Sequence, residues 1–169
     1  MSSNLFDMTN KVALITGSSK GIGRAIAEEM VRQGAKVVIS SRKADVCQEV
    51  ADAINAEAKA SGNQTGEAIV IPAHVGQREA LQHLVDETRA RLGQIDVLVC
   101  NAAVNPFYGS MQELPDDAMD KILDINIKSN HWLVNMVLPE MIERKDGSII
   151  IVSSVGGLRG SPVLGAYCI

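Results

Sequence analysis

Residues 16–23, with the sequence TGSSKGIG, decide the fold of this chain. The four residues before them, 12–15, are all apolar, which is typical of a strand buried in a parallel sheet. After them, apolar residues recur at positions 22, 25, 26 and 30, so a helix begins inside the glycine stretch. When a strand is followed by a glycine turn and a helix, the unpaired backbone amides and the positive end of the helix point to one place. Such a place favours binding of a phosphate or pyrophosphate.

Two other interpretations of this stretch are a nucleoside-triphosphatase loop and a turn without a ligand. The triphosphatase loop needs four residues between its glycines and then Gly-Lys-Ser/Thr. Here three residues separate Gly17 from Gly21, and Lys20 precedes the second glycine, so that loop is excluded. The glycines alone leave a turn without a ligand open, because short motifs often match by chance.

Length and composition predict one globular domain over residues 1–169. The chain has 46% hydrophobic and 21% charged residues, a net charge of −4 and no basic run, which argues against nucleic acid as a partner. No apolar stretch approaches the roughly 18 residues that cross a bilayer, and the first residues lack a signal-peptide pattern. We therefore expect a cytoplasmic protein without a membrane partner. Cys47, Cys100 and Cys168 lack metal or redox spacing, so we expect reduced thiols and no metal site.

Strand and helix patterns alternate along the chain. Apolar runs predict strands at residues 12–15, 36–40, 68–71, 95–100 and 148–152. Helical periodicity predicts helices from the glycine turn to Gly34, at 46–58, at 81–92 and at 115–145, the last bent at Pro139. Such alternation produces right-handed βαβ units. We expect an α/β fold of the Rossmann type, a doubly wound parallel sheet with strand order 3-2-1-4-5.

Four separated motifs occur in the order seen in one known family. Residues 16–23 fit the pattern TGxxxGIG, residues 101–103 follow the fourth predicted strand, Asn126 lies in the long predicted helix, and Ser154 precedes Tyr167 by thirteen positions. With this combination the whole chain resembles the short-chain dehydrogenases/reductases. These residues match, in order, the cofactor motif, the NNAG motif and the catalytic Asn, Ser and Tyr of that family. Residues 101–107 are most similar to those of NADPH-dependent carbonyl and retinal reductases of the peroxisomal type.

The resemblance implies hydride transfer between a nicotinamide cofactor and a small-molecule carbonyl or alcohol substrate. Such chemistry needs a proton donor or acceptor at the substrate oxygen. Tyr167 is expected to be this acid/base, Ser154 to be a second donor, and Asn126 to orient a proton-relay water. A free tyrosine has a pKa near 10, so a nearby cation must lower it, and the family uses a lysine. Each residue taken singly could instead be structural: a loop serine, a capping asparagine and a buried tyrosine.

The end of the second predicted strand favours NADP over NAD. NAD enzymes of this fold place Asp or Glu there, to bind the ribose 2′-hydroxyl. This chain has Ser41, Arg42 and Lys43 instead, which suit a 2′-phosphate, and Lys20 adds a further cation. The alternative is that these cations are solvated charges opening a helix. The predicted cofactor-binding residues are Gly17, Ser19, Lys20, Gly21, Ile22, Gly23, Ser41, Arg42, Lys43, His74, Val75, Asn101 and Ala102.

The chain also departs from the family pattern. Cys100 and Ala103 replace the first Asn and the Gly of the NNAG motif, and His74 replaces the family's usual Asp beside the adenine. The family's lysine would fall two residues beyond Ile169. The fifth predicted strand is apolar on both faces yet would form a sheet edge, so we expect a truncated form of a longer protein.

These departures keep three functions open. The first is an NADP-dependent oxidoreductase, which the resemblance implies to be a homo-oligomer, a tetramer or dimer, in its complete form. The second is a catalytically inactive nucleotide-binding fragment that lacks the active-site lysine. The third is a scaffold protein that kept the fold and lost the ligand. Binding and turnover measurements with NADPH separate them.

Overall fold

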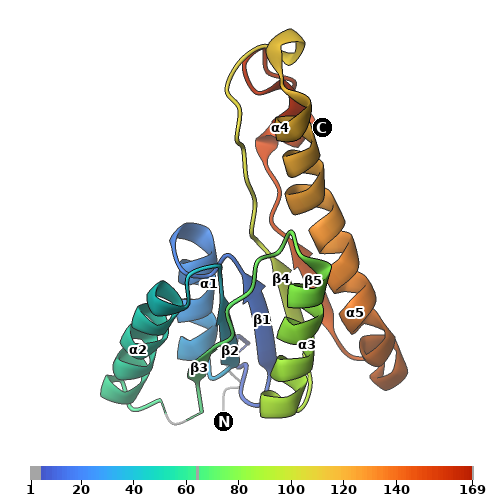
Figure 1. Cartoon of the computed structure of the whole chain (residues 1–169). Helices are drawn as coiled ribbons and strands as arrows, with labels where there is room; N and C mark the ends of the chain where they lie inside the picture. Colours follow the sequence, from blue (N-terminus) through green and yellow to red (C-terminus); the bar gives the residue numbers. More distant parts are fainter. Residues whose placement is uncertain (1–4, 64, 169) are drawn as a thin grey trace.

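The computed structural model describes residues 5–63 and 65–168, which contain a five-stranded sheet with helices on both faces (Figure 1). All four strand pairs are parallel. The order β3-β2-β1-β4-β5 confirms the predicted topology. The strands are β1 (Val12–Thr16), β2 (Lys36–Ser40), β3 (Glu67–Val70), β4 (Val97–Cys100) and β5 (Ser148–Ile151).

Strand β4 begins two residues later than the sequence predicts, because Asp96 binds the neighbouring strand through its side chain as well as through its backbone. The Asp96 carboxylate accepts a hydrogen bond from the Val12 amide at 2.8 Å, and the Asp96 amide donates to the Val12 carbonyl at 2.9 Å. A side chain thus takes the place of a backbone partner at this point. Gln94 binds the other carboxylate oxygen, so the buried charge is hydrogen-bonded on both sides.

The sheet separates two apolar layers. Alternate residues of a strand point to opposite faces, so Ile15 and Ile39 pack toward one layer while Leu14 and Val38 pack toward the other. Helices α1 (Gly21–Arg32) and α2 (Ala44–Ala60) cover the first layer, and helices α3 (Arg78–Leu92) and α5 (Ser129–Arg144) cover the second. This is the doubly wound arrangement that the sequence predicts.

The long helix predicted over residues 115–145 is divided in the structure. It consists of α4 (Asp116–Ile122), a π-helical segment (Leu123–Lys128) and α5. Pro139, the predicted position of a bend, lies inside α5, and the break in helical pattern lies at the π-helical segment instead. There the Ser129 hydroxyl donates to the Ile125 carbonyl and the Asn130 amide to the Asn126 carbonyl. Such side-chain bonds compete with the regular helical pattern.

The carboxyl ends of β4 and β5 lead into long segments that extend beyond the sheet toward α4 (Figure 1). These segments contain three short 3-10 helices, Met111–Glu113, Val155–Leu158 and Gly165–Cys168. Tyr167 therefore lies in a 3-10 helix. Ile169 lies outside the described residues.

Strand β5 forms an edge of the sheet, as predicted. Its Ile150 and Ile151 side chains are 43% and 53% exposed. A row of apolar side chains beside unpaired backbone groups is a surface that favours strand pairing. Within the described part of the chain, no helix combines the length and the apolar character that crossing a membrane requires.

Candidate functional site

The carboxyl end of β1 is joined to the end of β4 through one buried side chain. The Thr16 hydroxyl oxygen accepts hydrogen bonds from the amides of Asn101 at 3.0 Å and Ala102 at 3.1 Å. The Asn101 side chain donates in return to the carbonyls of Thr16 and Gly17, at 2.9 and 3.1 Å. The connections of this sheet reverse direction between β1 and β4, which is where open α/β sheets bind ligands.

A second buried hydroxyl joins the glycine turn to β2. The Ser18 hydroxyl donates to the Ile15 carbonyl and accepts from the Ser40 amide, both at 2.8 Å. The Ser18 amide donates to the Ser40 carbonyl at 3.2 Å. The Ser40 hydroxyl is itself buried and has no hydrogen-bond partner among the residues that the structure describes. The turn is therefore fixed on two sides before any ligand arrives.

The three glycines of the turn have different physical roles. Gly17 and Gly21 have φ angles of +66° and +57°, the left-handed region that disfavours side chains. A Cβ at Gly21 would meet nothing within 4 Å, so the space in front of it is open. A Cβ at Gly23 would lie 2.5 Å from Asn101 Nδ2 and 2.7 Å from the Gly17 carbonyl oxygen. Gly23 thus permits close packing, while Gly21 faces open space.

The amino end of α1 is available to an anion. Lys20 precedes the helix without a side-chain cap, and Gly21 and Ile22 are exposed, whereas Gly23 is buried against Asn101. The first amides of a helix have no partner inside the helix and carry its positive end. Ser19, half-buried, completes the turn. The predicted phosphate-binding stretch therefore has the geometry to hold a pyrophosphate.

Three cations surround the ends of β1 and β2. Lys20, Arg42 and Lys43 are exposed, and none forms an ion pair with a residue of the described chain. Ser41 is half-buried, and its hydroxyl lies 3.1 Å from the Cys47 sulfur. Arg42 and Lys43 precede α2, so the positive end of that helix adds to their charge.

The loop after β3 lies next to this positive region. The Ala73 amide donates to the Ser41 carbonyl at 3.1 Å, which holds the loop against the end of β2. His74 and Val75 follow and are half-buried, as expected for residues that line a cleft. The His74 ring nitrogen Nδ1 accepts a hydrogen bond from the Gly76 amide at 3.1 Å. The predicted cofactor-binding residues are thus spread along the carboxyl ends of β1, β2, β3 and β4.

Asn126 fixes the loop that follows β4. Its side-chain oxygen accepts from the Val104 amide and its side-chain nitrogen donates to the Val104 carbonyl, both at 2.9 Å. Both polar groups of the side chain are therefore taken by one backbone residue. The water-orienting role that the resemblance implies for Asn126 stays a prediction.

Ser154 and Tyr167 approach each other around Gly156. The Ser154 hydroxyl accepts from the Gly156 amide at 3.1 Å and caps the short 3-10 helix. A Cβ at Gly156 would lie 3.3 Å from the Ser154 hydroxyl, 3.4 Å from the Cys168 sulfur and 3.7 Å from Tyr167 Cδ1. The structure thus places the Ser154 hydroxyl and the ring of Tyr167, thirteen residues apart in sequence, beside the same glycine. Within the described chain, the Asn126 side chain forms its hydrogen bonds with Val104 and not with these two residues.

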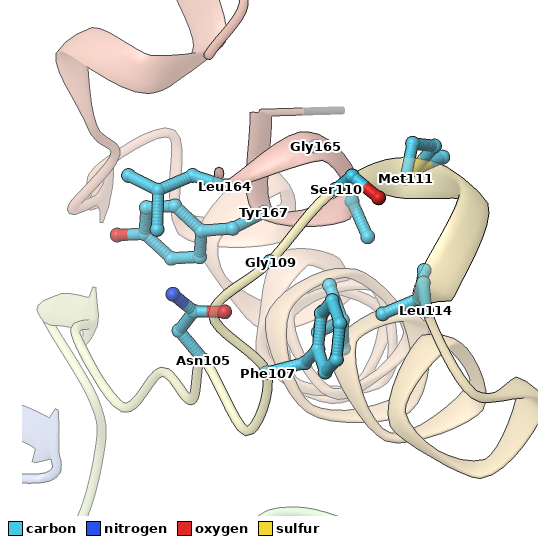
Figure 2. A pocket seen from close by; sticks show the side chains of 11 residues that line it. Asn105, Phe107, Gly109, Ser110, Met111, Leu114, Leu164, Gly165 and Tyr167 are labelled. Carbon is cyan, nitrogen blue, oxygen red and sulfur yellow. The ribbon is translucent and has the colours of Figure 1, made fainter. Parts of the chain in front are cut away.

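The loop after β4 also supports the turn that carries Tyr167. The Gly109 amide donates to the Val163 carbonyl at 3.0 Å, Gly109 forms a parallel bridge with Leu164, and the Tyr167 amide donates to the Leu164 carbonyl at 2.9 Å. A narrow pocket, too tight to admit a water molecule, lies between the two segments. Figure 2 shows the Tyr167 hydroxyl on the same side as the Asn105 side chain, away from Phe107.

Most of the pocket lining is apolar. The lining residues are Asn105, Phe107, Gly109, Ser110, Met111, Leu114, Ile122, Leu164, Gly165, Ala166 and Tyr167 (Figure 2). The sequence suggests Phe107 and Tyr108 as walls of a substrate cleft. Phe107 lines the pocket, whereas Tyr108 is 75% exposed and does not.

The three cysteines are free thiols, as expected. Cys47 and Cys100 are buried, and burial raises the pKa of the Cys100 thiol to about 12, so it stays protonated and unreactive. Within residues 5–63 and 65–168, no cluster of three His, Cys, Asp or Glu side chains is placed to hold a metal ion.

Several residues that build this site are missed by sequence reasoning. Thr16 and Ser18 are the two residues of the quoted motif that are not among the predicted cofactor-binding residues. Ser40 and Val104 were not singled out at all. A usable signal existed for Thr16 and Ser40, since each is a hydroxyl residue at the end of an otherwise apolar buried strand.

Comparison with known proteins places the chain in a family. A family model described as short chain dehydrogenase matches residues 11–169. The chain is 42% identical over 160 residues to "Dehydrogenase/reductase SDR family member 4" of Bos taurus, covering 95% of this chain and 55% of that protein. It is 41% identical over 160 residues to "Dehydrogenase/reductase SDR family member 2, mitochondrial" of Homo sapiens, covering 95% and 54%. It thus spans about half the length of these curated relatives.

Solved structures give the same result. A short-chain type dehydrogenase/reductase from Mycobacterium marinum has a TM-score of 0.86 and 32% identity, covering 97% of this chain and 64% of that one. A metagenomic short-chain oxidoreductase, solved in complex with NADP, has a TM-score of 0.86 and 31% identity, covering 95% and 69%. Together with the glycine turn and the Ser154–Tyr167 pair, these matches show that the chain belongs to the short-chain dehydrogenase/reductase family.

Proposed function

We propose that this chain binds NADP(H), and that the protein to which it belongs transfers a hydride between the nicotinamide and a carbonyl or secondary alcohol. One observation carries the cofactor part of this proposal: the uncapped amino end of α1 lies beside Lys20, Arg42 and Lys43, which have no acidic partner within the described chain. Exposed cations without partners attract a dianion such as a 2′-phosphate.

The residues present fit this cofactor. The open space at Gly21 leaves room for a pyrophosphate at the first amides of α1. Ser41 and Arg42 follow β2, where a ribose 2′-substituent lies in this fold, and neither would repel a phosphate. An Asp or Glu at the same place would do so. The NADP-bound metagenomic relative supports this assignment.

When bound, the nicotinamide supplies or accepts the hydride. We expect the Tyr167 hydroxyl to exchange a proton with the substrate oxygen and the Ser154 hydroxyl to donate a hydrogen bond to the same oxygen. Both side chains lie beside Gly156, the serine through its hydroxyl and the tyrosine through its ring carbon Cδ1, which supports these roles. Apolar residues beside Tyr167, Phe107 and Leu114 among them, favour an apolar ketone or aldehyde over a charged substrate.

Calorimetric titration of the chain with NADPH and NADH tests the cofactor part. We expect NADPH to bind more tightly by about tenfold or more, since a guanidinium–phosphate contact is charge-assisted. Arg42→Ala should remove most of this preference while leaving NADH affinity unchanged. Lys59→Ala, at the opposite end of the same helix, removes an exposed cation away from the site and is the matched control. Equal affinities for the two cofactors in the unmodified chain would refute the proposal.

A second candidate function is nucleotide binding without turnover. A tyrosine hydroxyl without a neighbouring cation is a weak base near neutral pH, and such a site would bind the nucleotide without turning it over. NADPH consumption with a panel of ketones and aldehydes decides between the two. Tight NADPH binding without consumption supports the second candidate, and no binding at all supports a scaffold that has lost its ligand.

A further inference from the structure

Cys47 places a thiol next to the proposed 2′-phosphate site, and the proposed function gives this group no role. Its side chain is completely buried near the start of α2, in the same apolar layer as Ile39, Val50 and Ala51. Its sulfur nevertheless lies 3.1 Å from the Ser41 hydroxyl oxygen. A buried cysteine usually behaves as a small apolar residue, so a contact with a hydroxyl at the edge of the ligand site needs an explanation.

The segment that carries the proposed phosphate contacts is attached to its surroundings through the backbone as well. The Ser41 carbonyl accepts a hydrogen bond from the Ala73 amide, and the Cys47 amide donates to the Lys43 carbonyl, both at 3.1 Å. Cys47 therefore binds the residue on each side of Arg42, one through its sulfur and the other through its amide.

Burial decides which of the two groups donates in the contact between Cys47 and Ser41. A thiol and a hydroxyl each carry one proton, and either can accept. Among residues 5–63 and 65–168, the Ser41 hydroxyl is the one hydrogen-bond partner of the buried Cys47 sulfur. Ser41 is half-buried and can give its own proton to water. Both protons find an acceptor only when the thiol donates to Ser41 Oγ and the hydroxyl proton points outward.

We propose that Cys47 is a positioning residue for the cofactor: its thiol donates to Ser41 Oγ and so keeps the Ser41 proton directed toward the 2′-phosphate of NADP(H). This inference rests on the proposed function, because it presumes that the phosphate binds beside Ser41. A phosphate dianion offers only acceptors, so it needs a donor at this position. The ribose 2′-hydroxyl of NAD(H) can donate as well as accept, so its binding does not depend on the direction of the Ser41 proton.

The direction of this hydrogen bond can be measured without any ligand. In the infrared spectrum, the S–H stretching band of Cys47 is the one that is missing from Cys47→Ala. Loss of the acceptor moves such a band to higher frequency, so Ser41→Ala should shift the Cys47 band upward and leave the bands of Cys100 and Cys168 unchanged. If Ser41→Ala leaves the Cys47 band in place, the thiol does not donate to Ser41 and the proposal is wrong.

Calorimetric titration with NADPH and NADH measures the effect on the cofactor. Cys47→Ala should weaken NADPH binding by about threefold to fivefold, the value of one weak hydrogen bond, and leave NADH binding unchanged. Ser41→Ala should weaken NADPH binding by at least this factor. Adding Cys47→Ala to Ser41→Ala should cause no further loss, because the thiol acts through the hydroxyl. Losses that multiply in the double variant would contradict the proposal.

Two further variants distinguish positioning from packing. Cys47→Ser places a hydroxyl in an apolar layer and should destabilise the fold in urea unfolding. It should nevertheless keep the NADPH affinity within about twofold, because it retains a donor. Val50→Ala removes buried methyl groups from the same side of α2 and should lower stability without changing cofactor affinity. An NADPH affinity that falls in step with stability across Cys47→Ala, Cys47→Ser and Val50→Ala would show that Cys47 only packs the core.

The outcomes separate this inference from the function on which it rests. If the unmodified chain binds neither NADPH nor NADH, the proposed cofactor is wrong and the inference fails with it. If the chain prefers NADPH but Cys47→Ala keeps the full NADPH affinity, the cofactor assignment stands and the inference about Cys47 is wrong.

Discussion

Replacing Thr16 by valine tests whether one hydroxyl joins the ends of β1 and β4. Valine keeps the shape of the side chain but removes the acceptor that binds the amides of Asn101 and Ala102, at 3.0 and 3.1 Å. A buried amide left without a partner costs about 1–3 kcal/mol. Asn101 and Ala102 are half-buried, so water recovers part of this cost. We expect the free energy of unfolding to fall by about 2–3 kcal/mol.

Urea unfolding measures this loss, and Thr88→Val is the matched control. Thr88 is also fully buried, but its hydroxyl donates at 2.7 Å to the Leu84 carbonyl inside α3, where the helix supplies a backbone partner. Thr88→Val should therefore cost less than about 1 kcal/mol. NADPH affinity should fall in Thr16→Val and not in Thr88→Val. Equal destabilisation by the two substitutions would refute the idea that Thr16 is a structural junction.

Three further outcomes are expected. Gly23→Ala should lower the melting temperature and weaken NADPH binding at least tenfold, because its Cβ would lie 2.7 Å from a backbone oxygen. Gly157→Ala, whose Cβ would have nothing within 4 Å, should change neither quantity. Asn126→Leu should destabilise the fold by about 2 kcal/mol in urea unfolding, since the Val104 amide and carbonyl both lose their partner. Asn126→Asp keeps the bond to the Val104 amide and should destabilise the fold less. Burial raises the pKa of the Cys100 thiol from its ordinary value of 9.0 to about 12, so the unfolded chain loses this proton at lower pH than the folded chain. The free energy of unfolding should therefore fall as pH rises from 9.0 toward 12, and Cys100→Ala should flatten this decline in unfolding measured against pH.

Most of the fold follows from local sequence. Runs such as residues 36–40 and 148–152 are short, apolar and bounded by glycine, so strand assignment needs no information from elsewhere in the chain. The strand order follows from the glycine turn after β1 and from the handedness of βαβ units. The start of β4 was misplaced because the Asp96 side chain bonds Val12, a contact between residues far apart in sequence that no local pattern reveals.

The π-helical segment at Leu123–Lys128 was not predictable for a related reason. Ile122, Ile125 and Ser129 continue an ordinary helical spacing, and the departure depends on where the Ser129 hydroxyl and the Asn130 side chain find their acceptors. Pro139 lies inside α5, which continues through it, so the interruption of the α-helical pattern is at the π-helical segment and not at the proline.

Spacing and residue type predict the candidate site, but they do not predict the hydrogen bonds that hold its residues in place. The residues TGSSKGIG and the Ser154–Tyr167 spacing identify a site, and the roles of individual residues in it await measurement. The contact between Ser18 and Ser40 joins residues 22 apart, and that between Asn126 and Val104 likewise. Serine and asparagine occur in many loops, so their partners become evident only when the chain is folded.

The two buried hydroxyls at the end of β1 and in the glycine turn have a consequence for the thermodynamics of ligand binding. Thr16 and Ser18 already hold the glycine turn in place through bonds within the protein. A ligand that arrives there need not order the loop, so little conformational entropy is lost on association. The heat-capacity change of binding should consequently be no larger than the surface buried by the ligand itself requires. Association should be rapid, because its rate is limited mainly by diffusional encounter and not by ordering of the loop.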